Sequence, residues 1–361
     1  MFASVRCPFS LRALIRAVIA VLFAVSASCG DALSGNRVST ARRASTETDV
    51  DSAAPPTLTE FVLPNPNSGP GGTRFARDGK LWFTEQTGNR IARMTKKGAV
   101  TEFPLPTANS SPRGLAPGPD GNIWFCEANR NRIGVMNRQG ALLAEHELPH
   151  PDSGPSGITV GLDGNLWFVE GDNQRGNRIG RITTSGVVAE FDLPIPKSAP
   201  NQIAVGPDGN LWFTEFAGSR IGTITHDGVL GAELALRPKS MPVGIVTGPD
   251  GNLWFTEREG NRIGRINAEG SLTEFDLPNA NSGPAGITPG RDGDLWFAEL
   301  FGNRIGRITT EGVITELELP NPNSGPRALT TDRHGNIWFA EFFGNRIGRL
   351  NSPAGDDGDE D

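Results

Sequence analysis

The chain has 361 residues, of which 46 are Gly, 28 are Pro and 7 are Trp, and its formal net charge is -7 at pH 7. So much Gly and Pro indicates many turns, yet the 37 % of hydrophobic residues suffices for a large core in a chain of this length. The acidic balance excludes the basic surface that nucleic-acid binding requires, so no nucleic-acid partner is expected.

The first segment, residues 1–29, has the pattern of a secretory signal peptide. Three arginines precede the apolar run 17–25, and small residues lead from it to Cys29. The run is too short for a membrane-spanning helix, which needs about 20 apolar residues. We therefore expect an exported protein that is periplasmic, extracellular or lipid-anchored to the cell envelope.

Cys29 leaves two alternatives open, a lipid anchor or a freely secreted protein. The small residues around it resemble a bacterial lipobox, but Ser26 stands where an aliphatic residue is usual. A lipid at Cys29 would be the only contact with a membrane. Residues 30–56 are small and polar and end in prolines, so they are expected to form a flexible linker.

A repeated tryptophan motif follows the linker. All seven tryptophans lie in segments such as NLWFTE, at spacings of 42, 43, 45, 42, 42 and 42 residues, and they are Trp82, Trp124, Trp167, Trp212, Trp254, Trp296 and Trp338. A period of this length lies within the roughly 40–45 residues of four-stranded propeller blades. Each repeat also carries an apolar segment, a tight turn that is Asp-Gly in six of the seven, and the segments RIGRIT and ITEFDLP or their variants.

These repeats predict an all-β fold over residues 57–351, a seven-bladed β-propeller of four-stranded antiparallel blades. The N-terminal segment 58–64 matches the last strand of a repeat, whereas the C-terminal repeat ends without that strand. The first strand is therefore expected to complete the last blade, which leaves no exposed sheet edge. The acidic tail 352–361 is expected to be disordered, and the protein to be a monomer.

One face of the predicted ring collects the longer loops. If the strands of a blade are called a to d from the centre outward, the b–c and d–a loops share this face, the top face. Its residues next to the central channel, one at the start of each a strand, are Gly71, Arg113, Ser156, Asn201, Val243, Ala285 and Arg327. Propeller ligands commonly bind near such a channel mouth, so we predict ligand binding at Arg113, Ser156, Asn201 and Arg327. Arg can recognise a carboxylate or another anion; the alternative is that these are solvated rim residues.

The expected partner on this face is a small molecule, a glycan or a protein. The b–c loop of the third repeat, residues 171–177, has seven residues where the other repeats have four. It is either a specificity element or a tolerated extension.

A second set of residues repeats in every blade. A glutamate three residues after each Trp is followed by an arginine across the b–c loop; the glutamates are Glu85, Glu127, Glu170, Glu215, Glu257, Glu299 and Glu341. Opposite charges at facing positions of two strands attract, so these pairs are interpreted as part of the scaffold. The four histidines show no Ser-His-Asp order and no zinc spacing, and no catalytic residue can be assigned.

The repeat ITEFxLPxPNSGPxGITxGxDGNLWFTExxGNRIGRIT resembles the virginiamycin B lyase (streptogramin B lyase) family over residues 57–351. The resemblance implies a seven-bladed propeller that opens the ester ring of streptogramin B depsipeptides by Mg²⁺-dependent elimination. It also implies a catalytic His after the Pro that begins the a strand in each of the last two repeats, with acidic residues nearby.

Here those two positions hold Ala285 and Arg327, and Gly325 stands where an acidic residue would precede the last Pro. Glu341 alone matches approximately, as a candidate Mg²⁺ carboxylate. Two functions therefore remain open: a ligand-binding or interaction propeller that has lost or altered the lyase site, and an active streptogramin B lyase that uses Mg²⁺.

Overall fold

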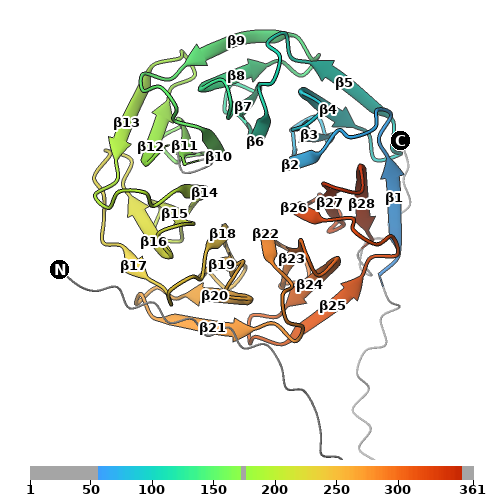
Figure 1. Cartoon of the computed structure of the whole chain (residues 1–361), viewed down its shortest axis with the longest axis vertical. Coiled ribbons are helices and arrows are strands. Elements are labelled where there is room, and N and C mark those ends of the chain that lie inside the picture. The colour runs from blue at the N-terminus through green and yellow to red at the C-terminus, as the bar shows by residue number, and fades with distance from the viewer. Residues whose placement is uncertain (1–55, 172–175, 352–361) are drawn as a thin grey trace, which may run out of the picture. The chain divides into compact units, whose positions relative to one another are not determined.

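The computed structural model describes residues 56–171 and 176–351, and it forms seven four-stranded antiparallel sheets around a central channel (Figure 1). The predicted all-β, seven-bladed propeller is confirmed. The predicted signal peptide, almost all of the linker, the acidic tail and the middle of the third b–c loop lie outside the described residues. No helix of the described part is long and apolar enough to cross a membrane.

The strands follow one another from the channel outward in every blade. The a strands are β2 (Pro70–Phe75), β6 (Pro112–Pro117), β10 (Pro155–Val160), β14 (Pro200–Val205), β18 (Pro242–Thr247), β22 (Pro284–Pro289) and β26 (Pro326–Thr331). The b strands are β3 (Leu81–Glu85), β7 (Ile123–Glu127), β11 (Leu166–Glu170), β15 (Leu211–Glu215), β19 (Leu253–Glu257), β23 (Leu295–Glu299) and β27 (Ile337–Glu341). The c strands are β4 (Arg90–Met94), β8 (Arg132–Met136), β12 (Arg178–Ile182), β16 (Arg220–Ile224), β20 (Arg262–Ile266), β24 (Arg304–Ile308) and β28 (Arg346–Leu350). The d strands are β5 (Val100–Pro104), β9 (Leu142–Glu147), β13 (Val188–Asp192), β17 (Leu234–Ala235), β21 (Leu272–Asp276), β25 (Ile314–Glu318) and β1 (Leu58–Val62). Blades are numbered 1 to 7 in this order.

The ring closes through the first strand of the described chain, as predicted. β1 is the outer strand of blade 7, and it pairs antiparallel with β28 from Leu58 opposite Leu350 to Val62 opposite Arg346. The ring of Phe61 on this strand stacks on Trp338 of the same blade, with centroids 5.6 Å apart. Closure therefore combines backbone hydrogen bonds with a buried aromatic contact.

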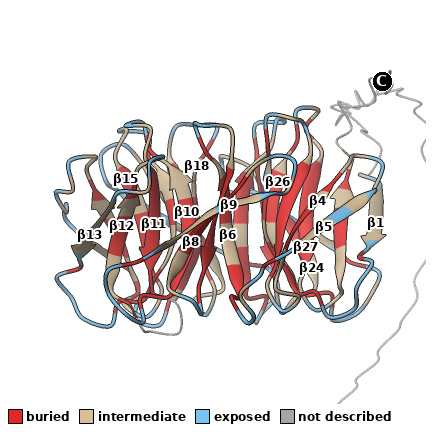
Figure 2. Cartoon of the chain, turned by 90° about the horizontal axis from the view of Figure 1, so that it is seen from above, coloured by how far each residue is buried: buried red, intermediate tan, exposed pale blue. Residues whose placement is uncertain are grey.

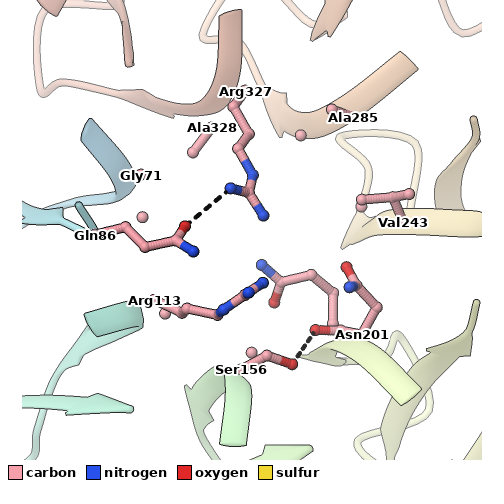
Figure 3. A pocket seen from close by; sticks show the side chains of 15 residues that line it. Gly71, Gln86, Arg113, Ser156, Asn201, Val243, Ala285, Arg327 and Ala328 are labelled. Carbon is pink, nitrogen blue, oxygen red and sulfur yellow. Dashed lines mark hydrogen bonds between the residues drawn. The ribbon is translucent and has the colours of Figure 1, made fainter. Parts of the chain in front are cut away.

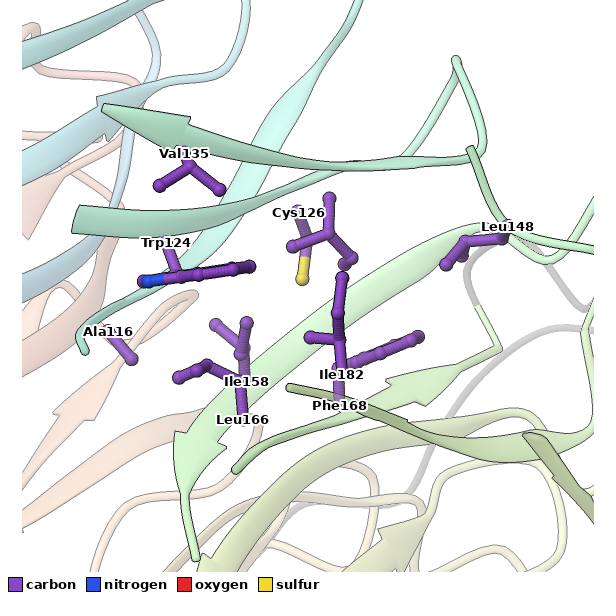
Figure 4. Close-up of a cluster of buried hydrophobic side chains, with 10 residues drawn as sticks. Ala116, Trp124, Cys126, Val135, Leu148, Ile158, Leu166, Phe168 and Ile182 are labelled. Carbon is purple, nitrogen blue, oxygen red and sulfur yellow. The ribbon is translucent and has the colours of Figure 1, made fainter. Parts of the chain in front are cut away.

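The hydrophobic core is divided into layers between neighbouring blades. In one such layer Trp124 and Cys126 of blade 2 face Ile158 and Phe168 of blade 3 (Figure 4). Figure 2 shows buried residues along the strands and exposed residues in the loops of both faces. Cys126 is fully buried in this layer, and burial raises the pKa of its thiol, so the residue acts as a small core side chain.

Arginines of the c strands join several blades to their neighbours. In blade 5, Arg265 lies 5.4 Å from the centroid of the Trp254 ring, and its Nη1 donates a hydrogen bond of 2.7 Å to the carbonyl of Thr310 in blade 6. The same arrangement links blade 7 to blade 1, where Arg349 covers Trp338 and donates to the carbonyl of Lys96. Each arginine thus shields a tryptophan and ties two blades together.

The a strands approach one another closely around the channel because the third residue in five of the seven is glycine. An added Cβ at Gly114 would lie 2.2 Å from the carbonyl oxygen of Ser156, and one at Gly72 would lie 2.6 Å from that of Arg113. No side chain fits at such distances, so glycine permits the backbones of adjacent blades to meet.

Candidate functional site at the channel mouth

The two kinds of top-face loop hold each other in place. The backbone N–H of Thr87 in a b–c loop donates to the carbonyl of Ser68 in a d–a loop at 3.1 Å. Asn345, from the repeated Gly-Asn-Arg segment, accepts a hydrogen bond from the N–H of Ser68 and donates to the carbonyl of Asn65, at 2.7 and 2.9 Å. The repeated Asn and Ser residues therefore fix where each a strand begins.

A cavity of about 90 Å³ lies at the top-face end of the channel. All seven channel positions named from the sequence line it. The structure thus brings together the predicted binding residues Arg113, Ser156, Asn201 and Arg327 (Figure 3). The other three positions are Gly71, Val243 and Ala285, which carry no polar side chain. The remaining lining residues are Gly72, Gln86, Gly114, Gly157, Gln202, Gly244, Gly286 and Ala328. The space can hold several water molecules or a small polar group.

Arg327 is held in a defined position over this cavity. Its Nη1 donates a hydrogen bond of 3.1 Å to Oε1 of Gln86, and its guanidinium lies 5.2 Å from the centroid of the Phe342 ring. The contact with the Phe342 ring and the hydrogen bond both restrict the guanidinium, so its orientation is set within the protein itself.

Sequence reasoning missed Gln86. It directly follows the repeated glutamate of blade 1, and the corresponding residue in blade 7 is Phe342. A comparison of the repeats could have identified Gln86. The residue after the repeated glutamate is polar and uncharged in blade 1, whereas it is Ala, Gly, Phe, Arg or Leu in the other blades. Gln202 was missed as well, although it replaces the glycine found at that position in five other blades.

Arg113 reaches into the same cavity from blade 2. Its backbone carbonyl accepts a hydrogen bond of 2.8 Å from Oγ1 of Thr84, which anchors the beginning of its strand to blade 1. Figure 3 shows the side chains of Arg113 and Arg327 both directed into the cavity. Nearby, Oγ of Ser156 donates to the backbone carbonyl of Asn201 at 3.1 Å, so this hydroxyl supports the rim.

The two sides of the cavity differ in polarity. Arg327, Gln86 and Arg113 supply charged and polar groups, whereas Val243 and Ala285 on blades 5 and 6 supply a buried apolar wall. Among the described residues, the lining contains two guanidinium groups and no carboxylate or imidazole. The charged groups of the described lining therefore all lie on one side of the mouth.

The repeated glutamates lie away from this cavity, fully buried at the ends of the b strands. In blade 7, Oε2 of Glu341 lies 2.8 Å from Nη2 of Arg346, and the same arginine also lies 3.7 Å from Glu60 on the d strand. The predicted Glu–Arg pair is thus present, but a second glutamate shares the arginine. In blade 2 the arginine, Arg132, instead contacts Glu145 and Glu147.

Burial and the sharing of one arginine change the acidity of these glutamates. Burial, opposed by hydrogen bonds, raises the pKa of Glu85 and of Glu127 to about 7 and that of Glu170 to about 8. The neighbouring d-strand carboxylate adds repulsion in each case. Since the arrangement recurs around the ring, it belongs to the scaffold.

Mg²⁺ does not fit the surroundings of Glu341. One of its carboxylate oxygens already accepts hydrogen bonds from Arg346, and the described residues contain no group of three His, Cys, Asp or Glu side chains arranged to hold a metal ion. Mg²⁺ needs several oxygen ligands in a near-octahedral arrangement, and an arginine beside the carboxylate opposes a cation. No step of a reaction is therefore assigned to a metal here.

The four histidines all lie outside the channel mouth. His146 stacks on Trp124, and burial lowers its pKa. His150 forms a hydrogen bond with Glu190 at the outer side of the ring. Nε2 of His226 accepts a hydrogen bond from the backbone N–H of Leu162, and Nε2 of His334 accepts one from the side chain of Arg333. Each imidazole thus has a structural partner, and the described lining offers no imidazole as a general base.

Comparison with known proteins gives one consistent result. The sequence profile of the virginiamycin B lyase family matches residues 52–176 and 171–356. A solved streptogramin B lyase structure is 42 % identical, with a TM-score of 0.78, and the alignment covers 82 % of this chain and 98 % of that chain.

Two further relatives carry the same family name. A catalytically inactive His-to-Ala variant of virginiamycin B lyase from Staphylococcus aureus, solved with quinupristin, is 40 % identical, with a TM-score of 0.78 and coverage of 82 % of this chain and 99 % of that one. The virginiamycin B lyase of Bacillus licheniformis is 46 % identical over 43 residues, which are 12 % of this chain and 15 % of that protein.

Proposed function

The chain belongs to the virginiamycin B lyase family, and from that premise we propose that it is an exported, monomeric propeller that binds a ligand at the channel mouth and has lost the lyase reaction. The observation that carries the proposal is the replacement of both expected catalytic histidines. Ala285 and Arg327 occupy those positions, and the described cavity lining contains no imidazole. Removal of the proton next to an ester carbonyl requires a general base within hydrogen-bond reach, and an arginine cannot serve as one at neutral pH.

The family relationship also supports binding without turnover. The His-to-Ala variant of the Staphylococcus aureus relative is catalytically inactive and was solved with quinupristin. A propeller of this family can therefore lose its reaction and still be found with a streptogramin. We propose the same separation for this chain, with a small molecule, a glycan or a protein segment as the ligand on the top face.

Export is the second part of the proposal, and it is supported by the sequence of residues 1–29, which has the order of a secretory signal. Attachment to the envelope would then occur through a lipid at Cys29. Growth of a producing strain with a radioactive fatty acid tests this, since label retained by the wild type and lost from Cys29→Ser identifies the anchor. Unlabelled protein in the medium would show that the chain is secreted instead.

The loss of the lyase reaction is tested by incubating the purified protein with quinupristin, with Mg²⁺ or with a chelator. Elimination opens the ring without a change of mass, so the products are separated by chromatography and identified by fragmentation. The Staphylococcus aureus lyase serves as the positive control. We expect intact cyclic quinupristin; a linear product formed only with Mg²⁺ would overturn the proposal and restore the lyase assignment.

A further inference from the structure

We propose that the lower part of the central channel is a binding site for a small monovalent inorganic anion of the halide class, and that the guanidinium of Arg74 holds this anion. The site is separate from the cavity at the channel mouth. The inference goes beyond the proposed function, because it requires neither the loss of the lyase reaction nor export.

The architecture of blade 1 places Arg74 inside the ring. Arg74 is the fifth of the six residues of β2, the innermost strand of the blade (Figure 1). It is three residues beyond Gly71 of the channel mouth, which corresponds to about 10 Å along a strand. The side chain of Arg74 is exposed, although β2 lies between the inner strands β26 and β6 of the neighbouring blades. Its guanidinium therefore meets water through the channel.

Arg74 has no charged partner among the described residues. Its side chain makes one hydrogen bond there, from Nη1 to the backbone carbonyl of Thr73 at 2.8 Å. A guanidinium has five N–H donors, so most of them remain for a ligand. Desolvation by the surrounding strands lowers the pKa of Arg74, and no neighbouring charge contributes to this change. The group still carries its positive charge throughout the physiological pH range.

The other blades supply no carboxylate at this level of the channel. In every blade the corresponding residue lies opposite the repeated Trp, as Arg74 lies opposite Trp82. The other six are Ala116, Thr159, Ala204, Val246, Thr288 and Thr330. The seven a strands contain no Asp, Glu or His at any position. Asp78, in the a–b turn below Arg74, instead accepts a hydrogen bond from the backbone N–H of Lys80.

The single charge sets the class of the ligand. A positive charge in a narrow channel with reduced hydration attracts an anion. One guanidinium balances one negative charge, whereas a dianion would leave a negative charge unpaired where hydration is reduced. Each a strand has a partner strand on one side only, so backbone N–H groups of its inner edge supply further donors. A halide ion is spherical and accepts from donors in any direction, so it fits this environment.

Bromide tests the inference directly, because it replaces chloride and scatters X-rays anomalously. Crystals grown without halide are soaked in sodium bromide, and we expect an anomalous peak within hydrogen-bond distance of the Arg74 guanidinium. Arg74→Gln should lose this peak. Arg77→Gln is the matched control, since it removes an exposed arginine from the a–b turn of the same blade, and it should retain the peak.

Thermal unfolding provides the measurement in solution. The protein is unfolded in sodium chloride and in sodium gluconate at equal ionic strength. We expect the wild type to melt about 2–4 °C higher in chloride, because an anion that binds only the folded state stabilises it. This difference should disappear in Arg74→Gln and persist in Arg77→Gln.

Several outcomes would overturn the inference. No bromide at Arg74, or equal melting temperatures of the wild type in the two salts, would refute the site even if Arg74→Gln failed to fold. Bromide only at Arg113 or Arg327 would place the anion at the channel mouth instead. A stabilisation that depends on Arg74 more strongly for sulfate than for chloride would refute the monovalent class. None of these results depends on turnover of quinupristin, so the proposed function is tested separately.

Discussion

Arg327 donates a hydrogen bond of 3.1 Å to Gln86 although the two residues are 241 positions apart in the chain. Arg327 is the second residue of the a strand of blade 7, and Gln86 lies in the b–c loop of blade 1, so the bond spans the junction at which the ring closes. The charged part of the channel mouth is therefore assembled from the two ends of the described chain. Its geometry depends on the closure of the propeller.

Removal of the closing strand should affect both stability and the site. Deletion of residues 57–64 removes β1 and leaves the edge of β28 unpaired, and it also removes Phe61 from its stack on Trp338. We expect the free energy of unfolding to fall by about 3 kcal/mol or more, as for loss of a buried aromatic side chain. Denaturant titration measures this, and deletion of 352–361 is the control. Unchanged unfolding of the shorter chain would contradict closure by β1.

Gln86→Ala should weaken the site without unfolding the protein. The substitution removes the hydrogen bond that orients Arg327 but leaves the stack of its guanidinium on Phe342. With quinupristin as the probe of the channel mouth, we expect binding to weaken a few-fold, a smaller effect than that of Arg327→Gln, with the unfolding midpoint unchanged. Calorimetry and thermal unfolding provide the two readouts. A loss of affinity equal to that of Arg327→Gln would mean that Gln86 itself contacts the ligand.

Two tryptophans of the repeat should differ in their contribution to stability. Trp254 is fully buried and packs against both Arg265 and Phe275, so Trp254→Ala is expected to cost about 3–5 kcal/mol. Trp212 is only partly buried and faces Thr223, where blade 5 has Arg265. Trp212→Ala should therefore cost clearly less. Urea unfolding of both variants ranks them, and the opposite order would refute the role given to the covering arginine.

Stability should fall as the pH rises from 5 to 8. The raised pKa values, about 7 for Glu85 and Glu127 and about 8 for Glu170, mean that the folded state keeps protons that the unfolded chain has released. Such groups stabilise the fold fully below the unfolded pKa of about 4.3, and this contribution is lost as the pH rises through the folded values. Urea titrations at pH 5 and pH 8 measure the difference.

Glu170→Gln tests the cause of this pH dependence. The amide has the shape of the carboxyl group and does not titrate, so the variant should show a smaller difference in unfolding free energy between pH 5 and pH 8. Glu259→Gln, at an exposed position of a top-face loop, is the control and should retain the wild-type difference. A stability that rises from pH 5 to pH 8 in the wild-type protein would show that the buried glutamates are ionised in the fold.

The sequence by itself determined the architecture, because the propeller repeats a local pattern seven times. The Trp spacing and the Gly-containing turns define strands that pair with their neighbours in the chain, and the unmatched segment 58–64 revealed the closure. The same register placed Arg113 and Arg327 at the channel, since one rule locates the residue after the Pro that begins every a strand.

Only the tertiary structure decided what surrounds those residues. Gln86 of blade 1 binds Arg327 of blade 7 across the ring closure, and Phe342 contacts it from within blade 7. No local sequence pattern encodes the contact between blades 7 and 1. The second acidic partner on these arginines was likewise missed, because its pairing depends on how the c and d strands bury their facing charges. Strand order follows from hydrogen bonding between neighbouring segments, whereas the charge and polarity of the channel mouth arise from side chains that converge from all seven blades.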